Sequence, residues 1–190
     1  ARADLRRETD ALGFTARERT GRASEAQIVQ SHLDQEVEAR ADLAERLAPE
    51  PRLVPQDFEA RVRMFGLINE IAGENGLGWS KRLILVGQAL NIAEPDSVEY
   101  AFWQTLGQKY LYTPAAGLAA KARMIEILIK LDAELAASRA RGSRYFIGDS
   151  LSALDIYAAC FYALLEPLPP DLCPMATAYR PAYRNADPDI

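Results

Sequence analysis

Histidine and cysteine are scarce in this sequence, and the scarcity of each excludes a class of protein. The 190 residues contain one histidine and two cysteines. Two cysteines are too few for a disulfide framework. With a single histidine they also cannot complete a zinc site of the usual Cys/His type, so we expect no metal. So few cysteines also favour a reducing compartment, which makes a cytoplasmic location our expectation.

Long apolar runs and basic blocks are lacking as well. No run approaches the roughly 20 apolar residues that a membrane-spanning helix needs, and the N-terminus is too polar for the apolar core of a signal peptide. The 22 Lys and Arg residues are outnumbered by 27 Asp and Glu residues, and the net charge is -5. We therefore expect neither a membrane nor a nucleic acid as partner.

The first 50 residues also lack the alternating, β-branched segments that are typical of strands. Helical periodicity takes their place. Val29, Leu33 and Val37 lie four residues apart, and so do Leu43 and Leu47. This spacing predicts one amphipathic helix over 25–48, with charged residues around an apolar stripe. Similar periodicity continues through most of the chain, so the predicted fold class is all-α.

Prolines mark a boundary between two parts of the chain. Pro49, Pro51 and Pro55 remove backbone donors and disfavour helix in the residues that precede them. We therefore divide the chain into a helical N-terminal arm with a proline-rich linker (1–55) and a helical domain (56–190).

The helices of the second part have recognisable start and stop signals. Asp57 is the expected N-cap of the first helix, Ser80 that of the second, and Asp96 or Ser97 that of the third. A fourth, long helix is expected to end at Gly142.

Apolar spacing then predicts which face of each helix is buried. We expect the core positions of the first and fourth helices to be Phe58, Val62, Phe65 and Ile68, and Leu118, Ala122, Ile125, Leu128 and Leu135.

The stretch "GDSLSALDIYAACFYALL" contains a strong helix start. Ser152 and Asp155 have the spacing of a capping box, in which each side chain bonds the other's backbone N–H. Leu151 and Ile156 flank this pair as a hydrophobic staple would. The helix that follows is apolar on every side, which predicts burial in the middle of the domain, with Cys160 as an inert buried residue.

This combination resembles the start of a buried helix in the helical C-terminal domain of cytosolic glutathione transferases. The long helix before it, the "RYFI" approach and the "DFEARVRMFGLINEIAGE" segment are similar to that family too, so the resemblance covers roughly residues 41–175. The resemblance implies a glutathione transferase C-terminal-like helical bundle. It also implies glutathione as co-substrate, no bound cofactor, and a homodimer.

The resemblance does not extend to the N-terminal half of that family, a thioredoxin-like domain that holds glutathione. Only about 50 residues precede the helical domain here, without strands, and Val54-Pro55 lies in the linker. No catalytic residue is assigned. In the family, an apolar co-substrate lies against the first helices of the helical domain. The resemblance therefore implies a binding site for an apolar small molecule. Its expected residues are Met64, Phe65, Ile68, Trp79, Tyr100 and Trp103, and core packing is the alternative for each of them.

Other chemical candidates have ordinary explanations. His32, on a charged helix, is expected to be a solvated surface residue. Cys173 is expected to pack in a loop. Glu70 and Glu74 share a helical face and could form a carboxylate pair, but a solvent-facing position is the favoured interpretation.

Two functions of different classes follow. The first is a glutathione transferase-like enzyme that joins the glutathione thiol to an apolar electrophile. The second is a non-catalytic binding or assembly module, in which the amphipathic 25–48 helix packs on a partner or a second copy. The alternative to such a partner is that the same stripe folds back onto its own domain. In a third alternative, the N-terminal 40 residues are partly disordered and have no role.

Overall fold

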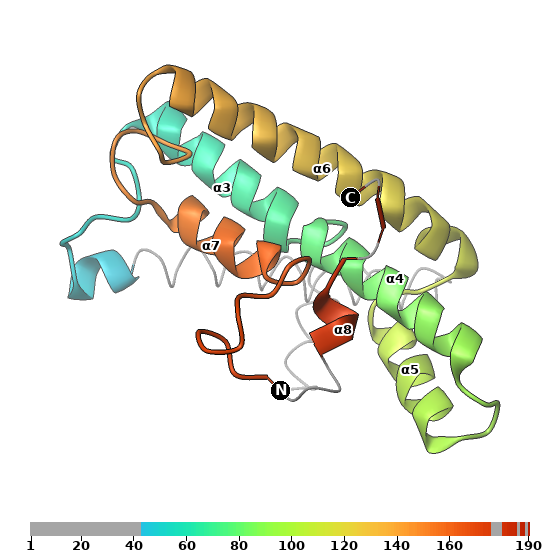
Figure 1. Ribbon diagram of the computed structural model, residues 1–190. Coiled ribbons are helices and arrows are strands. Elements are labelled where there is room, and N and C mark those ends of the chain that lie inside the picture. Colours follow the sequence, from blue (N-terminus) through green and yellow to red (C-terminus); the bar gives the residue numbers. More distant parts are fainter. Residues whose placement is uncertain (1–42, 176–179, 186, 189) are drawn as a thin grey trace, which may run out of the picture.

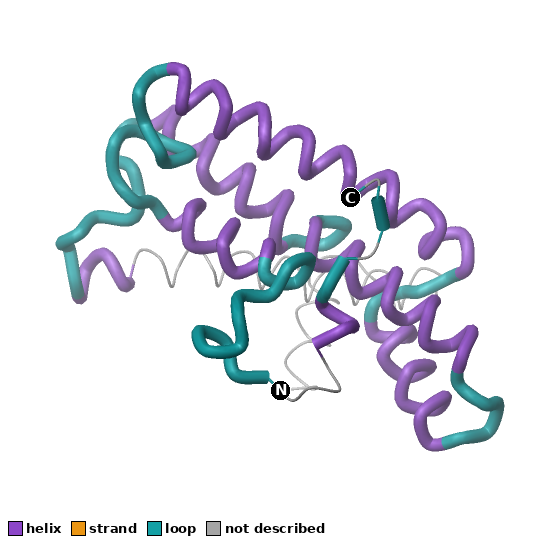
Figure 2. The backbone as a smooth tube through the Cα atoms, in the orientation of Figure 1, coloured by secondary structure: helices purple, strands orange, loops and turns teal. Residues whose placement is uncertain are grey.

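The computed structural model of the chain describes residues 43–175, 180–185, 187, 188 and 190, and in these residues it contains helices and no strand (Figures 1 and 2). This confirms the all-α fold class. The helices are α3 (Phe58–Ala72), α4 (Leu77–Ile92), α5 (Val98–Lys109), α6 (Pro114–Ala140), α7 (Ala153–Tyr162) and α8 (Arg180–Tyr183). None of the described helices is long and apolar enough to cross a membrane.

The long helix α6 organises the bundle. Its 27 residues span about 40 Å at 1.5 Å per residue. Helices α3 and α4 follow one another along this length, so α6 packs against both, and most closely against α4. Helix α7 packs on α3, and α5 packs on α4 at the opposite end of the bundle (Figure 1).

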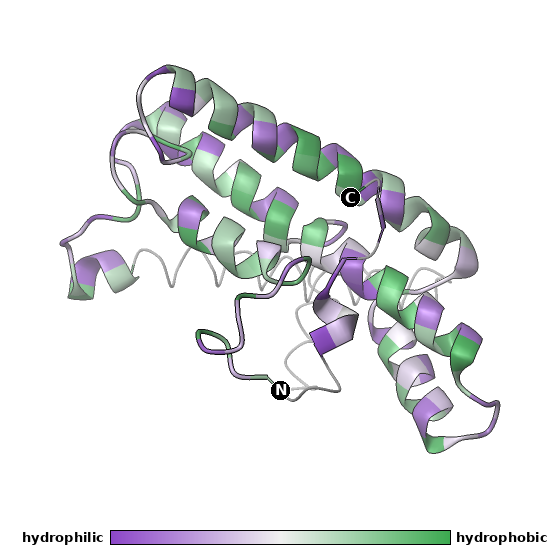
Figure 3. Cartoon of the chain, in the orientation of Figure 1, coloured by the Kyte–Doolittle hydropathy of each residue, from purple (hydrophilic) through white to green (hydrophobic). Residues whose placement is uncertain are grey.

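The hydrophobic core lies between α3, α6 and α7. Its largest fully buried side chains include Met64 and Ile71 of α3, Met124 and Leu131 of α6, and Leu154 of α7. Hydrophobic and hydrophilic residues are interspersed along α3 and α6, as expected for helices with one buried face (Figure 3).

The predicted core faces of α3 and α6 are wrong in part. Phe58 and Val62 are 67% and 55% exposed, and Leu118 is 82% exposed. Ala122 is exposed too. Each helix is rotated relative to the prediction because it contacts more than one neighbour, so its buried stripe is centred between them. The buried residues are Met64, Leu67, Ile68 and Ile71 on α3, and Ala120, Met124, Ile127, Leu131, Glu134 and Ser138 on α6.

The start of α4 also differs from the prediction. The helix begins at Leu77 behind Gly76, and Ser80 is a buried residue of its second turn, not a cap. Gly78 allows the first turn of α4 to lie close to α7. A Cβ atom at Gly78 would lie 2.3 Å from Cε1 of Phe161, so any larger residue would require the ring or the helix to move. This packing brings the first turn of α4 against the end of α7.

Helix α7 is not buried on every side, contrary to the prediction. Leu154 and Ala158 are buried against α3, but Ile156 is 41% exposed and Cys160 is exposed. The helix lies at the edge of the bundle, so a single stripe with i, i+4 spacing suffices to attach it.

Several sequence signals are confirmed. Asp57 Oδ1 accepts a hydrogen bond from the Ala60 N–H at 2.8 Å, and Ser97 Oγ accepts one from the Tyr100 N–H at 3.0 Å. Gly142, just after α6, has a φ of 88°, which favours glycine. Val29, His32, Leu33 and Val37, and with them most of the predicted 25–48 helix, lie outside the described residues.

The loop between α5 and α6 is fixed by an aromatic ring. A Cβ atom at Gly87 of α4 would lie 2.9 Å from the Tyr112 hydroxyl oxygen, and one at Gly117 of α6 would lie 2.8 Å from the Tyr112 ring. The Tyr112 N–H also bonds the Gly107 carbonyl of α5 at 2.8 Å. This contact locks the end of α5 against α4, and so positions the residues considered next.

Candidate ligand-binding face

Aromatic and cationic side chains meet where the first turns of α4 face the end of α5. The Trp79 and Tyr110 rings contact each other edge to face, with centroids 4.9 Å apart. The Arg82 guanidinium lies 5.3 Å from the centre of the Tyr110 ring, and Lys109 Nζ lies 5.7 Å from it. We refer to Trp79, Arg82, Lys109 and Tyr110 as the aromatic–cation cluster.

Local sequence explains this arrangement. Trp79 and Arg82 are three residues apart, so they occupy one face of α4. Lys109 is the last residue of α5, where a cation interacts favourably with the helix dipole, and Tyr110 is its C-cap. Leu111 then has a φ of 54°, and this turn ends α5. Packing of α4 on α5 therefore brings both pairs together.

The region around this cluster has a charge unlike that of the whole chain. Residues 75–93 and 100–125 contain no Asp or Glu, in a protein of net charge -5. The five cations in these two stretches are Lys81, Arg82, Lys109, Lys121 and Arg123. The first half of α4 and the end of α5 therefore carry positive charge without acidic residues of their own.

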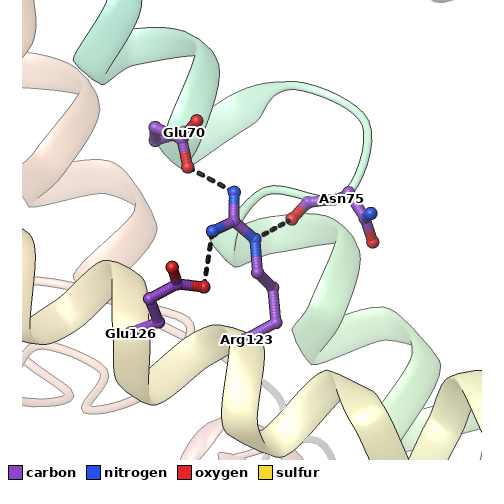
Figure 4. Close-up of polar contacts among 4 residues, drawn as sticks. All are labelled: Glu70, Asn75, Arg123 and Glu126. Carbon is purple, nitrogen blue, oxygen red and sulfur yellow. Dashed lines mark hydrogen bonds and ion pairs between the residues drawn. The ribbon is translucent and has the colours of Figure 1, made fainter.

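Two of these five cations have carboxylate partners in the structure. Lys121 Nζ lies 2.9 Å from the Asp187 carboxylate. Arg123 of α6 pairs with Glu70 and Glu126, and its Nε–H donates to the Asn75 carbonyl at 3.1 Å (Figure 4). The hydrogen bond to Glu126, followed by the charge of Glu70, raises the pKa of Arg123 despite its partial burial. Arg123 thereby fixes the turn between α3 and α4 to α6.

The other three cations have no carboxylate partner among the residues that the structure describes. Arg82 and Lys109 are exposed, whereas Lys81 is buried. Burial lowers the pKa of the Lys81 amine from its ordinary value of 10.5. Next to it, the buried Ser80 hydroxyl has no hydrogen-bond partner within the described part of the chain. This half of α4 therefore holds polar groups that the fold itself does not satisfy.

The six predicted binding residues are distributed over three environments. Met64 and Ile68 are core residues with 0% and 4% exposure, and Phe65 is a half-buried residue packed against that core. Tyr100 and Trp103 are half-buried on α5, where the Trp103 ring contacts Phe102 edge to face. Trp79 alone of the six belongs to the aromatic–cation cluster. Arg82, Lys109 and Tyr110 were not predicted from the sequence, although the stretches without acidic residues that contain them indicate a local positive charge.

The helix start at α7 has a well-defined geometry. Ser152 and Asp155 stand in a capping-box arrangement, but the well-formed bonds all run to the Asp155 carboxylate. Asp155 Oδ2 accepts from the Ser152 N–H at 2.8 Å and from its hydroxyl at 2.6 Å, and Oδ1 accepts from the Phe146 N–H at 3.0 Å. Leu151 and Ile156 are each 41% exposed. The box therefore also ties the loop after α6 to α7.

The remaining candidates have internal partners or lie apart from one another. Glu70 is paired with Arg123, not with Glu74. Cys173 is a half-buried loop residue whose carbonyl accepts from Arg180 at 2.9 Å. The described residues contain no group of three or more His, Cys, Asp or Glu side chains that could hold a metal ion.

An open groove of about 670 Å³ lies in the C-terminal part of the chain. Its lining residues are Glu166, Pro167, Leu168, Pro169, Pro170, Arg180, Pro181 and Arg184. The Arg180 guanidinium donates to the Leu168 and Cys173 carbonyls, and Arg184 pairs with Glu166 at 3.6 Å. The cations of this groove are thus engaged within the protein, unlike those of the aromatic–cation cluster.

Comparison of the chain with protein-family models, with curated proteins and with solved structures finds no match in any of the three. The function must therefore be inferred from the residues themselves.

Proposed function

We propose that this chain is a helical binding module that takes an apolar or aromatic small molecule against the Trp79–Tyr110 pair. The observation that carries the proposal is the edge-to-face contact of these two half-buried rings, at the surface between α4 and α5. Aromatic side chains that combine an apolar body with a polar tip are typical of small-molecule sites. The fixed α5–α6 loop, held by Tyr112, supports a preformed site.

This proposal is tested by the two tryptophans of the chain, Trp79 and Trp103. A neutral naphthalene derivative, 2-naphthalenemethanol, is titrated into the ¹⁵N-labelled protein while the two indole N–H resonances are followed. Binding at the proposed site shifts the Trp79 resonance and leaves that of Trp103 in place, and the Trp103→Phe variant assigns the two signals. Shifts of Trp103 alone, or of neither resonance, would contradict the proposal.

A glutathione transferase-like activity is our second proposal. It is supported by the Ser152–Asp155 box and its bond to Phe146, because these residues carry the resemblance to the helical domain of that family. The reaction would join the glutathione thiol to an apolar electrophile, and the helical domain would form the wall for the electrophile. Calorimetric titration with reduced glutathione tests it. Binding heat that saturates at a micromolar-to-millimolar glutathione concentration supports this proposal. The absence of binding heat at several millimolar glutathione would contradict it.

A further inference from the structure

We infer that the ligand of the aromatic–cation cluster is an organic anion, a planar aromatic ring with a carboxylate or sulfonate group. This inference rests on the proposed binding function and specifies the class of ligand. Its starting point is that Arg82 and Lys109 approach the same Tyr110 ring, at 5.3 Å and 5.7 Å. The two cations therefore place two positive charges near one ring, and an anion bound close to both would offset their mutual repulsion.

Such an anion has no competitor within the described structure. No described carboxylate pairs with Arg82 or Lys109, and neither stretch of chain that contributes to the cluster contains an acidic residue. In contrast, Arg123 and Arg180 are engaged by carboxylates or carbonyls of the protein. The cluster therefore offers an external anion two cations beside one ring, neither of them neutralised by a described carboxylate.

The chemistry of the two cations specifies the anion further. A guanidinium is planar and presents its N–H donors as a fork that fits a carboxylate or sulfonate. A lysine ammonium acts as a second point charge beside it. The buried Lys81 adds to the positive charge of the first half of α4.

The aromatic part of the ligand is specified by Trp79. Its ring is half-buried and contacts Tyr110 with an interplanar angle of 74°. A second planar ring gains most by packing on such an indole, because aromatic pairs prefer offset or edge-to-face contacts. A ligand that combines a negative charge with an aromatic ring therefore matches both the cations and the aromatic rings of the cluster.

The experiment compares 2-naphthoate with its neutral analogue 2-naphthalenemethanol, by calorimetry and by the Trp79 indole resonance of the full chain. We expect naphthoate to bind roughly tenfold more tightly at about 50 mM salt. Raising the salt to about 500 mM should weaken naphthoate binding and leave that of the alcohol unchanged, because only the former is electrostatic.

Variants then locate the effect. Arg82→Gln and Lys109→Gln should each weaken naphthoate binding, and the double variant should bind acid and alcohol equally. Arg144→Gln is the matched control, because Arg144 also lies over a tyrosine ring, 5.1 Å from the centre of Tyr145, and is the only cation of the described residues over that ring. It should leave both affinities unchanged. If Arg82→Gln failed to fold, Lys109→Glu would test the same charge by reversing it.

The outcomes separate this inference from the proposed function. Equal affinity for acid and alcohol in the unmodified protein, with the Trp79 resonance shifted by both, would overturn the anion and leave the binding module intact. A preference for naphthoate that survives the double variant would also overturn it. Failure of both probes to move the Trp79 resonance would overturn both proposals.

Discussion

Two regions of the bundle treat their polar groups differently. At the start of α7 and at the turn between α3 and α4, charged side chains have protein partners: Asp155 accepts three hydrogen bonds, and Arg123 bridges Glu70, Glu126 and the Asn75 carbonyl. Where α4 meets α5, Arg82, Lys109 and Lys81 have no described carboxylate. The comparison indicates that the first region contributes to stability, whereas the second holds charge that a ligand can use.

The largest effect should come from removing the acceptor at the start of α7. In Asp155→Ala, the Ser152 and Phe146 N–H groups lose their partner in a part-buried site. Lost capping and unsatisfied donors together should lower the free energy of unfolding by about 2–4 kcal/mol. Urea unfolding followed by circular dichroism measures this.

Asp149→Ala is the matched control for that variant. Asp149 is an exposed residue of the same loop and is not the cap of α7. A surface substitution of this kind should change stability by less than about 0.5 kcal/mol. Similar losses in the two variants would show that the loop tolerates no change of charge, and the role given to Asp155 would be wrong.

The sequence predicts the helix starts better than the helix faces, for a physical reason. Caps such as Asp57, Ser97 and the Ser152–Asp155 box depend on residues within three or four positions of each other, so their pattern is local. The buried face of a helix depends on which neighbours it contacts. Leu118 shows this: it fits the apolar spacing of α6, yet 82% of it is exposed, because the buried stripe runs through Ala120 and Met124.

The aromatic–cation cluster was predictable only in part for the same reason. Trp79 was expected at a binding site from the family resemblance, with core packing as the alternative. Its partner Tyr110 is 31 positions away in sequence and meets it only because α5 folds back on α4. Long-range contacts of this kind leave no local pattern. The absence of acidic residues around both positions was the one signal of shared charge.

The second largest effect tests the contact between α4 and α7. A Cβ at Gly78 would lie 2.3 Å from the Phe161 ring, so Gly78→Ala must displace either that ring or α4 itself. Overpacking of this kind should cost about 1–3 kcal/mol. Gly66→Ala on α3, where no atom lies within 4 Å of the new Cβ, should instead stabilise the protein by about 0.5–1 kcal/mol. Thermal unfolding of both variants gives the comparison, and a loss in Gly66→Ala would contradict it.

A third, smaller effect concerns the buried Lys81. Its folded pKa is lowered by burial, so between that pKa and the ordinary value of 10.5 the unfolded chain binds more protons than the folded one. The free energy of unfolding therefore rises with pH across this window. Lys81→Met removes the buried charge, and should stabilise the protein by about 1 kcal/mol at pH 7.

The advantage of Lys81→Met should shrink as the pH rises towards 10.5, because the wild-type amine then loses its charge in both states. Urea unfolding of the two proteins at several pH values measures the difference, in which the titration of all other groups cancels. A constant difference across the alkaline range would contradict the role of charge and indicate a packing effect.

The smallest effect compares two arginines and sharpens the contrast between the two regions directly. Arg123→Gln loses two carboxylate partners that are themselves partly solvent-exposed, so it should cost about 0.5–1 kcal/mol, and less at high salt. Arg82→Gln loses no carboxylate among the described residues, and its thermal midpoint should stay at the wild-type value. For naphthoate binding the order of the two variants is reversed: the affinity should fall in Arg82→Gln and stay unchanged in Arg123→Gln. A variant that lost stability and affinity together would show that the same cations serve both purposes, and the two regions would then not differ in kind.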